Sequence, residues 1–185
     1  MPREVFISVD VETAGPIPGR YSMLTLGACV IGRPEATFAV RLQPQSNEAD
    51  PEALRVTGLS LEELAQTGLP PQEAMENFAE WIGVQSEGDT PVFVGLNAAF
   101  DWSFVNYYFF TYTGQNPFGF APLDIKSMFY GASDCTWRDT RSSRITAALG
   151  MSRKGTHEAL ADAQFQAELF ALLQERRPPL PPAPN

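Results

Sequence analysis

The sequence predicts an α/β domain in which helices pack on a mixed sheet. Three strand-like segments joined by short connections come first, and helical and strand-like segments alternate after them. Short connections suit antiparallel neighbours, so the first three strands are expected to form a meander. At 185 residues, the chain is expected to form one domain over residues 1–175, followed by a disordered Pro-rich tail over residues 176–185.

The meander is predicted from β-branched and alternating apolar residues. Residues 5–12 are expected to form a core strand, followed by a turn at residues 15–19 that holds two glycines and two prolines. Residues 23–31 and 36–42 are expected to be the second and third strands, and the latter alternates apolar and polar side chains.

The rest of the chain is predicted from helical spacing and capping signals. Ser60 with Glu63 three residues later indicates a capping box, Gly150 closes a short helix, and Thr156 is expected to cap a last helix that runs to about Glu175. A continuous apolar run at residues 91–96 is typical of a strand buried on both faces. Further helices are expected at residues 51–57, 60–66, 72–84, 101–112 and 144–149, and a strand passing into a helix at residues 122–128.

The net charge of −9 argues against nonspecific electrostatic binding to nucleic acid or to an anionic membrane. It does not exclude a polyanionic substrate, because bound divalent cations would neutralise clustered carboxylates. Charge is also uneven along the chain. Residues 138–154 form either a phosphate-binding surface or a solvated helix face, and they carry one acid, Asp139, with five bases: Arg138, Arg141, Arg144, Arg153 and Lys154.

The sequence also indicates a compartment. No signal peptide and no membrane-spanning stretch are expected. Cys29 and Cys135 are far apart and form no CxxC motif, so they are interpreted as reduced thiols. The expected localisation is cytoplasmic, with no membrane partner.

Two acids on the first strand suggest a metal site. Asp10 and Glu12 are two residues apart, so their side chains share one face of the strand at roughly 7 Å. Burying both is unfavourable unless a cation compensates, and oxygen ligands select a hard ion such as Mg²⁺ or Mn²⁺. The alternative is an exposed strand end with two solvated acids.

Two further acids and the single histidine extend this pattern. Asp101 follows the buried strand and could instead cap a helix. His157 precedes Asp162 by five residues, so the pair meets only if His157 lies at the entry to the last helix. Histidine is the side chain that exchanges a proton near neutral pH.

Three segments taken together, residues 10–13, 97–101 and 157–163, resemble in order the three motifs of the DEDDh (DnaQ-like) 3′–5′ exonucleases. The family includes RNase T, oligoribonuclease and proofreading exonucleases, and the resemblance covers residues 5 to about 173. It implies an RNase H-like fold: a five-stranded mixed sheet with the first three strands antiparallel, flanked by helices. It also implies release of nucleoside 5′-monophosphates from the 3′ end of single-stranded RNA or DNA.

The resemblance assigns roles to individual residues. Asp10, Glu12, Asp101 and Asp162 would hold two divalent cations, Mg²⁺ or Mn²⁺, and His157 would act as general base, with Glu12 also at the catalytic centre. Substrate contacts are implied for six residues: the backbone amides of Thr13 and Ala14, the side chains of Met23 and Leu24 as wedges against the last bases, Asn97 as the orienting residue of its loop, and Phe100 as a stacking surface. Core packing is an equally open interpretation for Met23, Leu24 and Phe104.

Two positions depart from the family pattern, and several alternatives stay open. Ala14 stands where many members have Thr, and Thr25 stands where Glu is common. Neither position binds metal, so activity is expected while the subfamily and the choice between RNA and DNA are open. A second hypothesis is a polymerase- or RNA-associated nucleic-acid-binding subunit with little activity, with the Pro-rich tail as a docking arm. An RNase H-like endonuclease fits poorly, and a homodimer is a further expectation.

Overall fold

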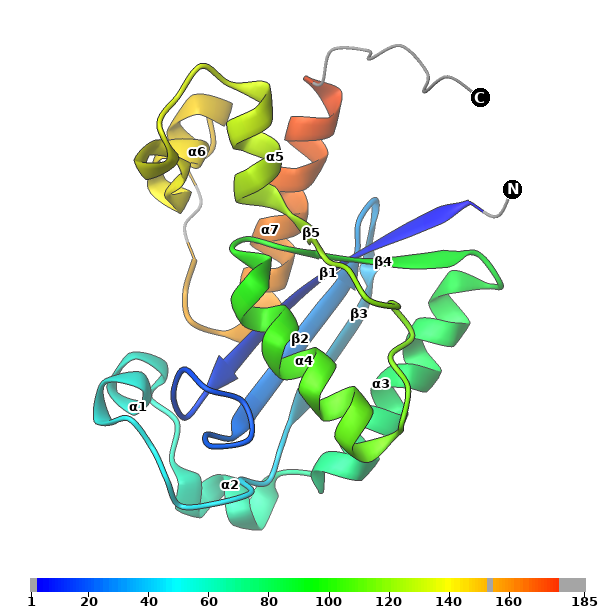
Figure 1. Ribbon diagram of the computed structural model, residues 1–185, viewed down its shortest axis with the longest axis vertical. Coiled ribbons are helices and arrows are strands. Elements are labelled where there is room, and N and C mark those ends of the chain that lie inside the picture. The colour runs from blue at the N-terminus through cyan, green and yellow to red at the C-terminus, as the bar shows by residue number, and fades with distance from the viewer. Residues whose placement is uncertain (1–2, 153–154, 177–185) are drawn as a thin grey trace.

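The protein has a five-stranded mixed sheet, as expected (Figure 1). The computed structural model describes residues 3–152 and 155–176. Strand order is β3-β2-β1-β4-β5, with the first three strands antiparallel and β4 and β5 parallel to β1. The strands are β1 (Glu4–Thr13), β2 (Met23–Val30), β3 (Arg33–Arg41), β4 (Thr90–Gly95) and β5 (Leu123–Asp124).

The predicted helices are present within four residues of their expected bounds, and one short 3₁₀ helix was not predicted. The helices are α1 (Pro51–Thr57), α2 (Leu61–Thr67), α3 (Pro71–Ser86), α4 (Ala98–Tyr112), α5 (Ile125–Ala132), η1 (Trp137–Thr140), α6 (Ser142–Leu149) and α7 (Ala159–Glu175). Among the described residues, no helix is long and apolar enough to cross a membrane.

Alternation along β1 sends its side chains to two different layers. Ile7, Val9 and Val11 join a core with α3 and α4 on one face of the sheet. Asp10 lies on the opposite face, where its carboxylate meets Gln166 of α7. The acids of β1 therefore lie between the sheet and α7.

A glycine in β2 allows α7 to approach this face closely. A Cβ atom on Gly27 would lie 2.2 Å from the backbone nitrogen of Leu160 and 2.3 Å from the carbonyl carbon of Ala159. Such distances are impossible for a real side chain, so any larger residue at position 27 would push the start of α7 away. Gly27 thus fixes the first turn of α7 against the end of the sheet where Asp10 and Glu12 lie.

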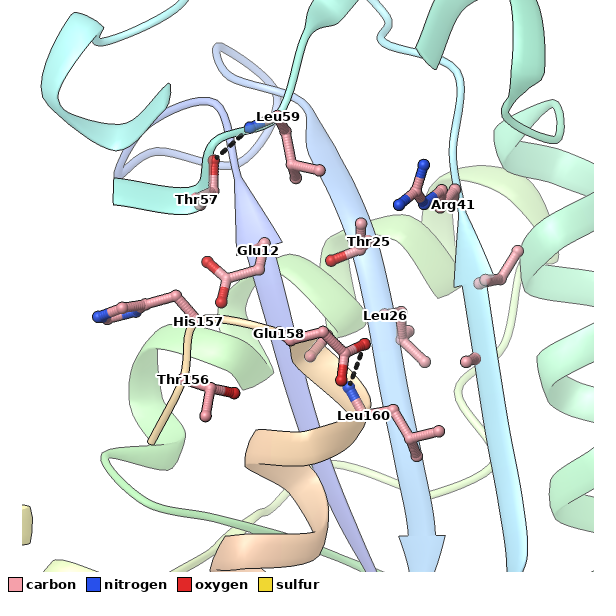
Figure 2. Close-up of a pocket in the computed structure, with 13 residues that line it drawn as sticks. Glu12, Thr25, Leu26, Arg41, Thr57, Leu59, Thr156, His157, Glu158 and Leu160 are labelled. Carbon is pink, nitrogen blue, oxygen red and sulfur yellow. Dashed lines mark hydrogen bonds between the residues drawn. The ribbon is translucent and has the colours of Figure 1, made fainter. Parts of the chain in front are cut away.

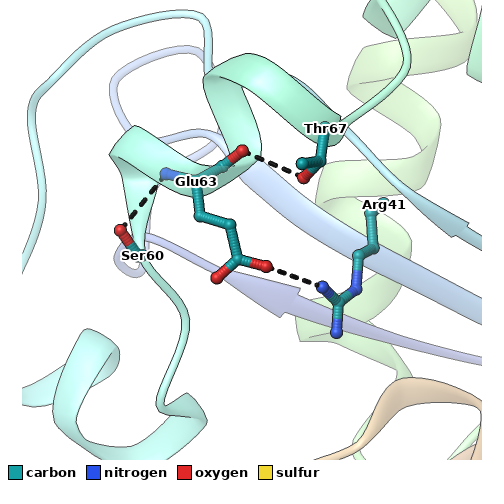
Figure 3. A network of polar contacts seen from close by, with 4 residues as sticks. All are labelled: Arg41, Ser60, Glu63 and Thr67. Atoms are coloured by element: carbon teal, nitrogen blue, oxygen red, sulfur yellow. Dashed lines mark hydrogen bonds and ion pairs between the residues drawn. The ribbon is translucent and has the colours of Figure 1, made fainter.

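The Ser60 signal is confirmed in part (Figure 3). The Ser60 hydroxyl accepts a hydrogen bond from the Glu63 backbone amide at 3.3 Å, which caps α2. The Glu63 carboxylate forms an ion pair with Arg41 at 3.2 Å, so β3 is joined to α2. The Gly150 prediction is also confirmed, because Gly150 ends α6 in a left-handed conformation.

Three boundary predictions need correction. Thr156 does not cap α7; the Glu158 side chain does, accepting from the backbone amide of Ala161 at 2.8 Å. Asp101 is not a helix cap either, because α4 begins three residues earlier. Arg176, expected in the tail, donates to the carbonyls of Ala148 and Leu149 and so belongs to the folded unit. The rest of the predicted tail, residues 177–185, lies outside the described residues.

Candidate active site

All four predicted metal ligands and the predicted base border one cavity at the carboxyl end of β1. The cavity has a volume of about 300 Å³. Five of its lining residues carry the predicted chemistry: Asp10, Glu12, Asp101, His157 and Asp162. β1, α4, and α7 with the segment before it supply these residues, so the three sequence motifs meet at a single point of the fold.

Asp10 and Asp101 are positioned by groups of the protein interior. The Asp10 carboxylate accepts a hydrogen bond from the Gln166 side chain at 2.5 Å. Gln166 in turn accepts from the backbone amide of Leu96 at 2.8 Å, which joins α7 to the end of β4. The buried Asp101 carboxylate accepts from the backbone amide of Val11 at 3.0 Å. Each carboxylate still has lone pairs free for another partner.

Burial, together with crowding of negative charge, raises the pKa values of three carboxyl groups in this site. Burial, reinforced by Asp101, Glu12 and Asp162, raises the pKa of Asp10 well above its usual range. Burial raises the pKa of Glu12 to about 7, with further contributions from the Asp162 and Glu158 carboxylates. Burial also raises the pKa of Asp101 to about 7, although the Val11 amide opposes this shift. Without a cation, the folded protein therefore disfavours full ionisation of the cluster.

Asp162 organises the segment that enters α7. Its two carboxylate oxygens accept hydrogen bonds from the backbone amides of Thr156 at 2.7 Å and His157 at 2.9 Å. The Thr156 hydroxyl also lies 3.2 Å from the same carboxylate. These contacts explain how a histidine five residues before Asp162 comes to lie beside it.

His157 is exposed and has a left-handed backbone, with φ of 59°. For a residue with a Cβ atom this conformation is uncommon, and it is found where surrounding contacts impose it. A ring nitrogen of His157 and one oxygen each of Glu12 and Asp162 all lie within 4.8 Å of one another. The expected entry position of His157 is therefore confirmed.

A second cavity, of about 440 Å³, adjoins the first beyond Glu12 (Figure 2). It lies over β2 and β3, with Thr25 on its floor and Thr57 and Leu59 on the side of α1. His157 and Glu158 form the opposite side. Glu12 and His157 line both cavities, so a ligand at the carboxylates could extend into this second space.

Three of the predicted substrate contacts are contradicted. The side chains of Met23 and Leu24 are fully buried and pack in the core, so they present no wedge to a ligand. The Ala14 amide donates to the Ser22 carbonyl at 2.8 Å and is already used within the turn. The interpretation of Phe104 as a core residue is confirmed. Thr13 lies next to Glu12, and no contact tests its predicted role.

Asn97 and Phe100 do border the carboxylate cavity. Asn97 has a left-handed backbone with φ of 69°, which turns the chain from β4 into α4. The Ala98 amide beside it donates to the Asp124 carboxylate at 2.9 Å. Phe100 is half-buried and packs on Phe104 with ring centroids 5.4 Å apart. Their predicted contacts with substrate stay predictions.

Sequence reasoning missed three residues that position the site: Gln166, Asp124 and Glu158. Gln166 lies four residues after Asp162 on α7, so it shares a helix face with a predicted ligand, and that spacing could have revealed it. Asp124 follows an expected strand and caps α5 through the Ser127 amide at 2.9 Å, but its bond to Ala98 has no local signal. In the sequence, Glu158 looks like any acid in the first turn of a helix, and only its contact with the Ala161 amide shows that it caps α7.

The donor set fits hard divalent cations. Asp10, Glu12, Asp101 and Asp162 offer carboxylate oxygens only, which Mg²⁺ and Mn²⁺ prefer over softer ligands. The pKa values of Asp10, Glu12 and Asp101 are raised first by burial and then by neighbouring carboxylates, so a bound cation would favour their ionised forms. His157 adds one nitrogen at the exposed edge of the set.

Comparison with known proteins shows the family of the chain. The exonuclease family described as RNase T matches residues 7–170. The 3′–5′ DNA exonuclease Cap18 of Escherichia coli is 56% identical over 174 residues, which cover 94% of this chain and 93% of that protein.

Solved structures show the same fold at low identity. The nuclease domain of 3′hExo, a DEDDh family member bound to rAMP, matches with a TM-score of 0.74 at 14% identity and covers 92% of each chain. A complex of E. coli exonuclease I with single-stranded DNA matches with a TM-score of 0.72 at 19% identity, covering 95% of this chain and 41% of that one. The chain therefore belongs to the RNase T exonuclease family and is a 3′–5′ exonuclease with the RNase H-like fold of the DEDDh enzymes.

Proposed function

We propose that this protein removes nucleotides one at a time from the 3′ end of single-stranded DNA, with two divalent cations, Mg²⁺ or Mn²⁺, as cofactors. The observation that carries the proposal is the convergence of Asp10, Glu12, Asp101, Asp162 and His157 on one cavity. Bound there, the cations would neutralise the phosphate and supply Lewis acidity at the bond that breaks.

The four carboxylates divide into fixed and adjustable ligands. Asp10 and Asp101 are held by Gln166 and by the Val11 amide, so they would set the position of the cations. Asp162 would hold a cation while it keeps the backbone of Thr156 and His157 in place. Glu12 borders both cavities and would also face the terminal nucleoside, which the second cavity is large enough to receive.

His157 would act as the general base. A water oxygen attacks the scissile phosphorus while a ring nitrogen of His157 takes a proton from that water. The bond from phosphorus to the 3′ oxygen of the preceding nucleotide breaks, and this oxygen becomes the new 3′ hydroxyl of the shortened strand once protonated. The product is a nucleoside 5′-monophosphate. His157 suits this role because it lies at the exposed edge of the site, where it can return its proton to solvent.

DNA is favoured over RNA by the high identity to a protein named as a DNA exonuclease. The RNA-directed relatives are similar at identities that establish the fold alone. Phe100 at the cavity edge would contact a base or sugar without selecting sequence. A cytoplasmic location and a homodimer stay predictions, and sedimentation velocity tests the second.

The test is digestion of a single-stranded 20-nucleotide DNA, labelled at the 5′ end in one reaction and at the 3′ end in another, with Mg²⁺ or Mn²⁺. The proposal predicts a ladder of shortened 5′-labelled products and immediate release of labelled mononucleotide from the 3′ end. RNA of the same sequence should be degraded more slowly. Internal fragments, or no mononucleotide with either cation, would contradict the proposal. If the protein binds the DNA but does not digest it, the alternative of a non-catalytic nucleic-acid-binding subunit would be supported.

A further inference from the structure

The part of the chain from α5 to the start of α6 carries positive charge outside any ion pair of the described residues, and an exposed tryptophan, beside the carboxylate cavity. We infer that Lys126, Trp137, Arg141 and Arg144, called here the basic strip, bind the part of a single-stranded substrate that lies 5′ to the scissile phosphate. The inference rests on the proposed function and adds to it a second binding surface with a defined ligand: a phosphodiester backbone with one stacked base.

Charge is the first observation that supports the basic strip. Residues 126–144 hold four of the chain's 13 basic residues and two of its 22 acidic ones, although the protein as a whole carries a net charge of −9. Within the described ranges, ion pairs are formed by Arg20, Arg41 and Arg55, and by no member of the basic strip. Unpaired cations clustered on an acidic protein are suited to a polyanion.

The acids near the basic strip leave its charge available. Asp134 is exposed and forms no ion pair in the described part of the chain. The Asp139 carboxylate accepts hydrogen bonds from the Thr136 hydroxyl at 2.7 Å and the Thr136 amide at 3.1 Å. These bonds, with Arg144 and Arg141 nearby, lower the pKa of Asp139. Both guanidinium groups are therefore near Asp139 but form no ion pair with it in the described part of the chain.

An aromatic surface is the second observation. The side chain of Trp137 is 53% exposed and packs edge-on against Tyr130, with ring centroids 5.9 Å apart. The Lys126 ammonium lies 4.9 Å from the centroid of the Trp137 ring. Proteins that bind single-stranded nucleic acid combine exposed aromatic rings with nearby cations, because every base has a face that can stack.

Continuity with the carboxylate cavity is the third observation. The Lys126 ammonium donates to the Asn97 side chain at 3.4 Å, and Asn97 lines that cavity. At the other end of the basic strip, Ser142 follows Arg141 and lines the same cavity together with His157. The basic strip thus begins where the scissile phosphate would lie.

The direction of the strand follows from the charges on the two sides of the site. α1 and α6 lie on opposite sides of the carboxyl end of β1 (Figure 1). On the side of α1, the second cavity has Glu12 and Glu158 at its edge, and its cation Arg41 is paired with Glu63. This side suits a terminal nucleoside, which has no phosphate beyond the scissile one. The phosphate-rich remainder of the strand is then left to the basic strip.

Two substrates distinguish binding to the basic strip from binding and reaction at the catalytic centre. The p-nitrophenyl ester of thymidine 5′-monophosphate contains one nucleoside and the scissile phosphate, whereas a single-stranded 20-nucleotide DNA reaches the basic strip. For Arg141→Glu combined with Arg144→Glu, we expect KM for the DNA to rise tenfold or more and KM for the ester to stay within twofold. Trp137→Ala should raise KM for the DNA about fivefold or more, as expected for one stacked base.

Matched controls exclude general effects of charge and of aromatic removal. Arg3→Glu combined with Arg33→Glu makes the same charge change at the opposite end of the sheet. Phe120→Ala removes a ring that is 88% exposed and stacked on Phe110 in another part of the surface. Both controls should leave KM for the DNA within twofold. The salt dependence of log(kcat/KM) should become shallower by about 1.4 in the strip double variant, since each lost phosphate contact in a single strand contributes about 0.7.

Photocross-linking supplies a readout that does not require hydrolysis. A 4-thiothymidine placed about three to five nucleotides from the 3′ end should attach to peptides within residues 126–144, and one at the terminal nucleotide should not. The inference is wrong if upstream labels attach elsewhere, or if the strip variants lose activity on the ester and the DNA equally. Failure of the wild-type protein to hydrolyse either substrate would instead overturn the proposed function, and the cross-links would still decide the strip.

Discussion

Asp101 and Asp10 are fixed by the packed interior of the fold, whereas His157 is exposed on the segment that enters α7. The two acids accept hydrogen bonds from Val11 and Gln166, on elements that the core holds rigidly. His157 has a left-handed backbone held by one hydrogen bond from its amide to Asp162. The two sides of the site therefore differ. Asp10 and Asp101, called here the rigid wall, are carboxylates whose ionisation in the interior is unfavourable. His157, on the other side, offers a proton acceptor on an exposed segment.

The largest effect is expected from removing charge in the rigid wall. Asp101→Asn should abolish measurable exonuclease activity, because a carboxylate at the cation site is lost. The same change should stabilise the cation-free protein at pH 8 by about 1 to 3 kcal/mol, since a buried carboxyl with a pKa of about 7 no longer has to ionise. Urea unfolding in EDTA measures this. A destabilised Asp101→Asn protein would show that the carboxylate is structural instead.

The exposed side should respond differently. His157→Asn should lower kcat by about 100- to 10,000-fold, the usual range for loss of a general base, and should leave stability nearly unchanged. Asparagine is the matched replacement because it tolerates a left-handed backbone, whereas His157→Ala adds backbone strain to the loss of the imidazole. Stabilisation by Mn²⁺ in thermal unfolding should persist in His157→Asn. Near-normal turnover of this variant across neutral pH would remove His157 from the mechanism.

The raised pKa values of Glu12 and Asp101 should also make the stability of the fold depend on pH and on cations. Glu12 and Asp101 have folded pKa values of about 7, above their unfolded values near 4, so the folded state binds more protons between these values. Stability without cations should therefore fall as pH rises from about 4 to 7. Mg²⁺ or Mn²⁺ should raise the melting temperature more at pH 8 than at pH 5, because protons compete for the same carboxylates. Calorimetry at both pH values, with Asp101→Asn as control, checks the sign.

A smaller effect on cation affinity and activity is expected from changing Gln166, which supports Asp10 from α7. Gln166→Leu removes the donor that orients Asp10 and the acceptor for the Leu96 amide. Loss of such a supporting contact should weaken cation affinity or activity by about 10- to 100-fold. Titration of activity with Mn²⁺ should show a shifted midpoint that high Mn²⁺ restores. The conservative Gln166→Asn variant, too short to span both partners, should behave like Gln166→Leu, and an unchanged midpoint in both would assign Gln166 to packing alone.

The same division explains what the sequence could predict. Periodicity located the strands and helices, because regular elements fix which face a residue occupies. The resemblance of three motifs to the DEDDh exonucleases indicated the four acids and His157, which border one cavity. Long-range contacts such as Asp124 with Ala98 have no local pattern. Met23 and Leu24 were misassigned because both lie at the start of β2 and pack into hydrophobic clusters, and Ala14 because its amide is used by the Ser22 carbonyl. Thr156 was misassigned because Asp162 holds it outside the helix.

The most direct test of the central claim is an anomalous difference map from crystals of the protein soaked in Mn²⁺ with a nucleoside 5′-monophosphate. Two peaks should lie among the carboxylates of Asp10, Glu12, Asp101 and Asp162, with the phosphate of the nucleotide between them and His157 facing that phosphate. Peaks that avoid Asp10 and Asp101, or a phosphate bound away from these four carboxylates, would contradict a two-cation site built on this wall.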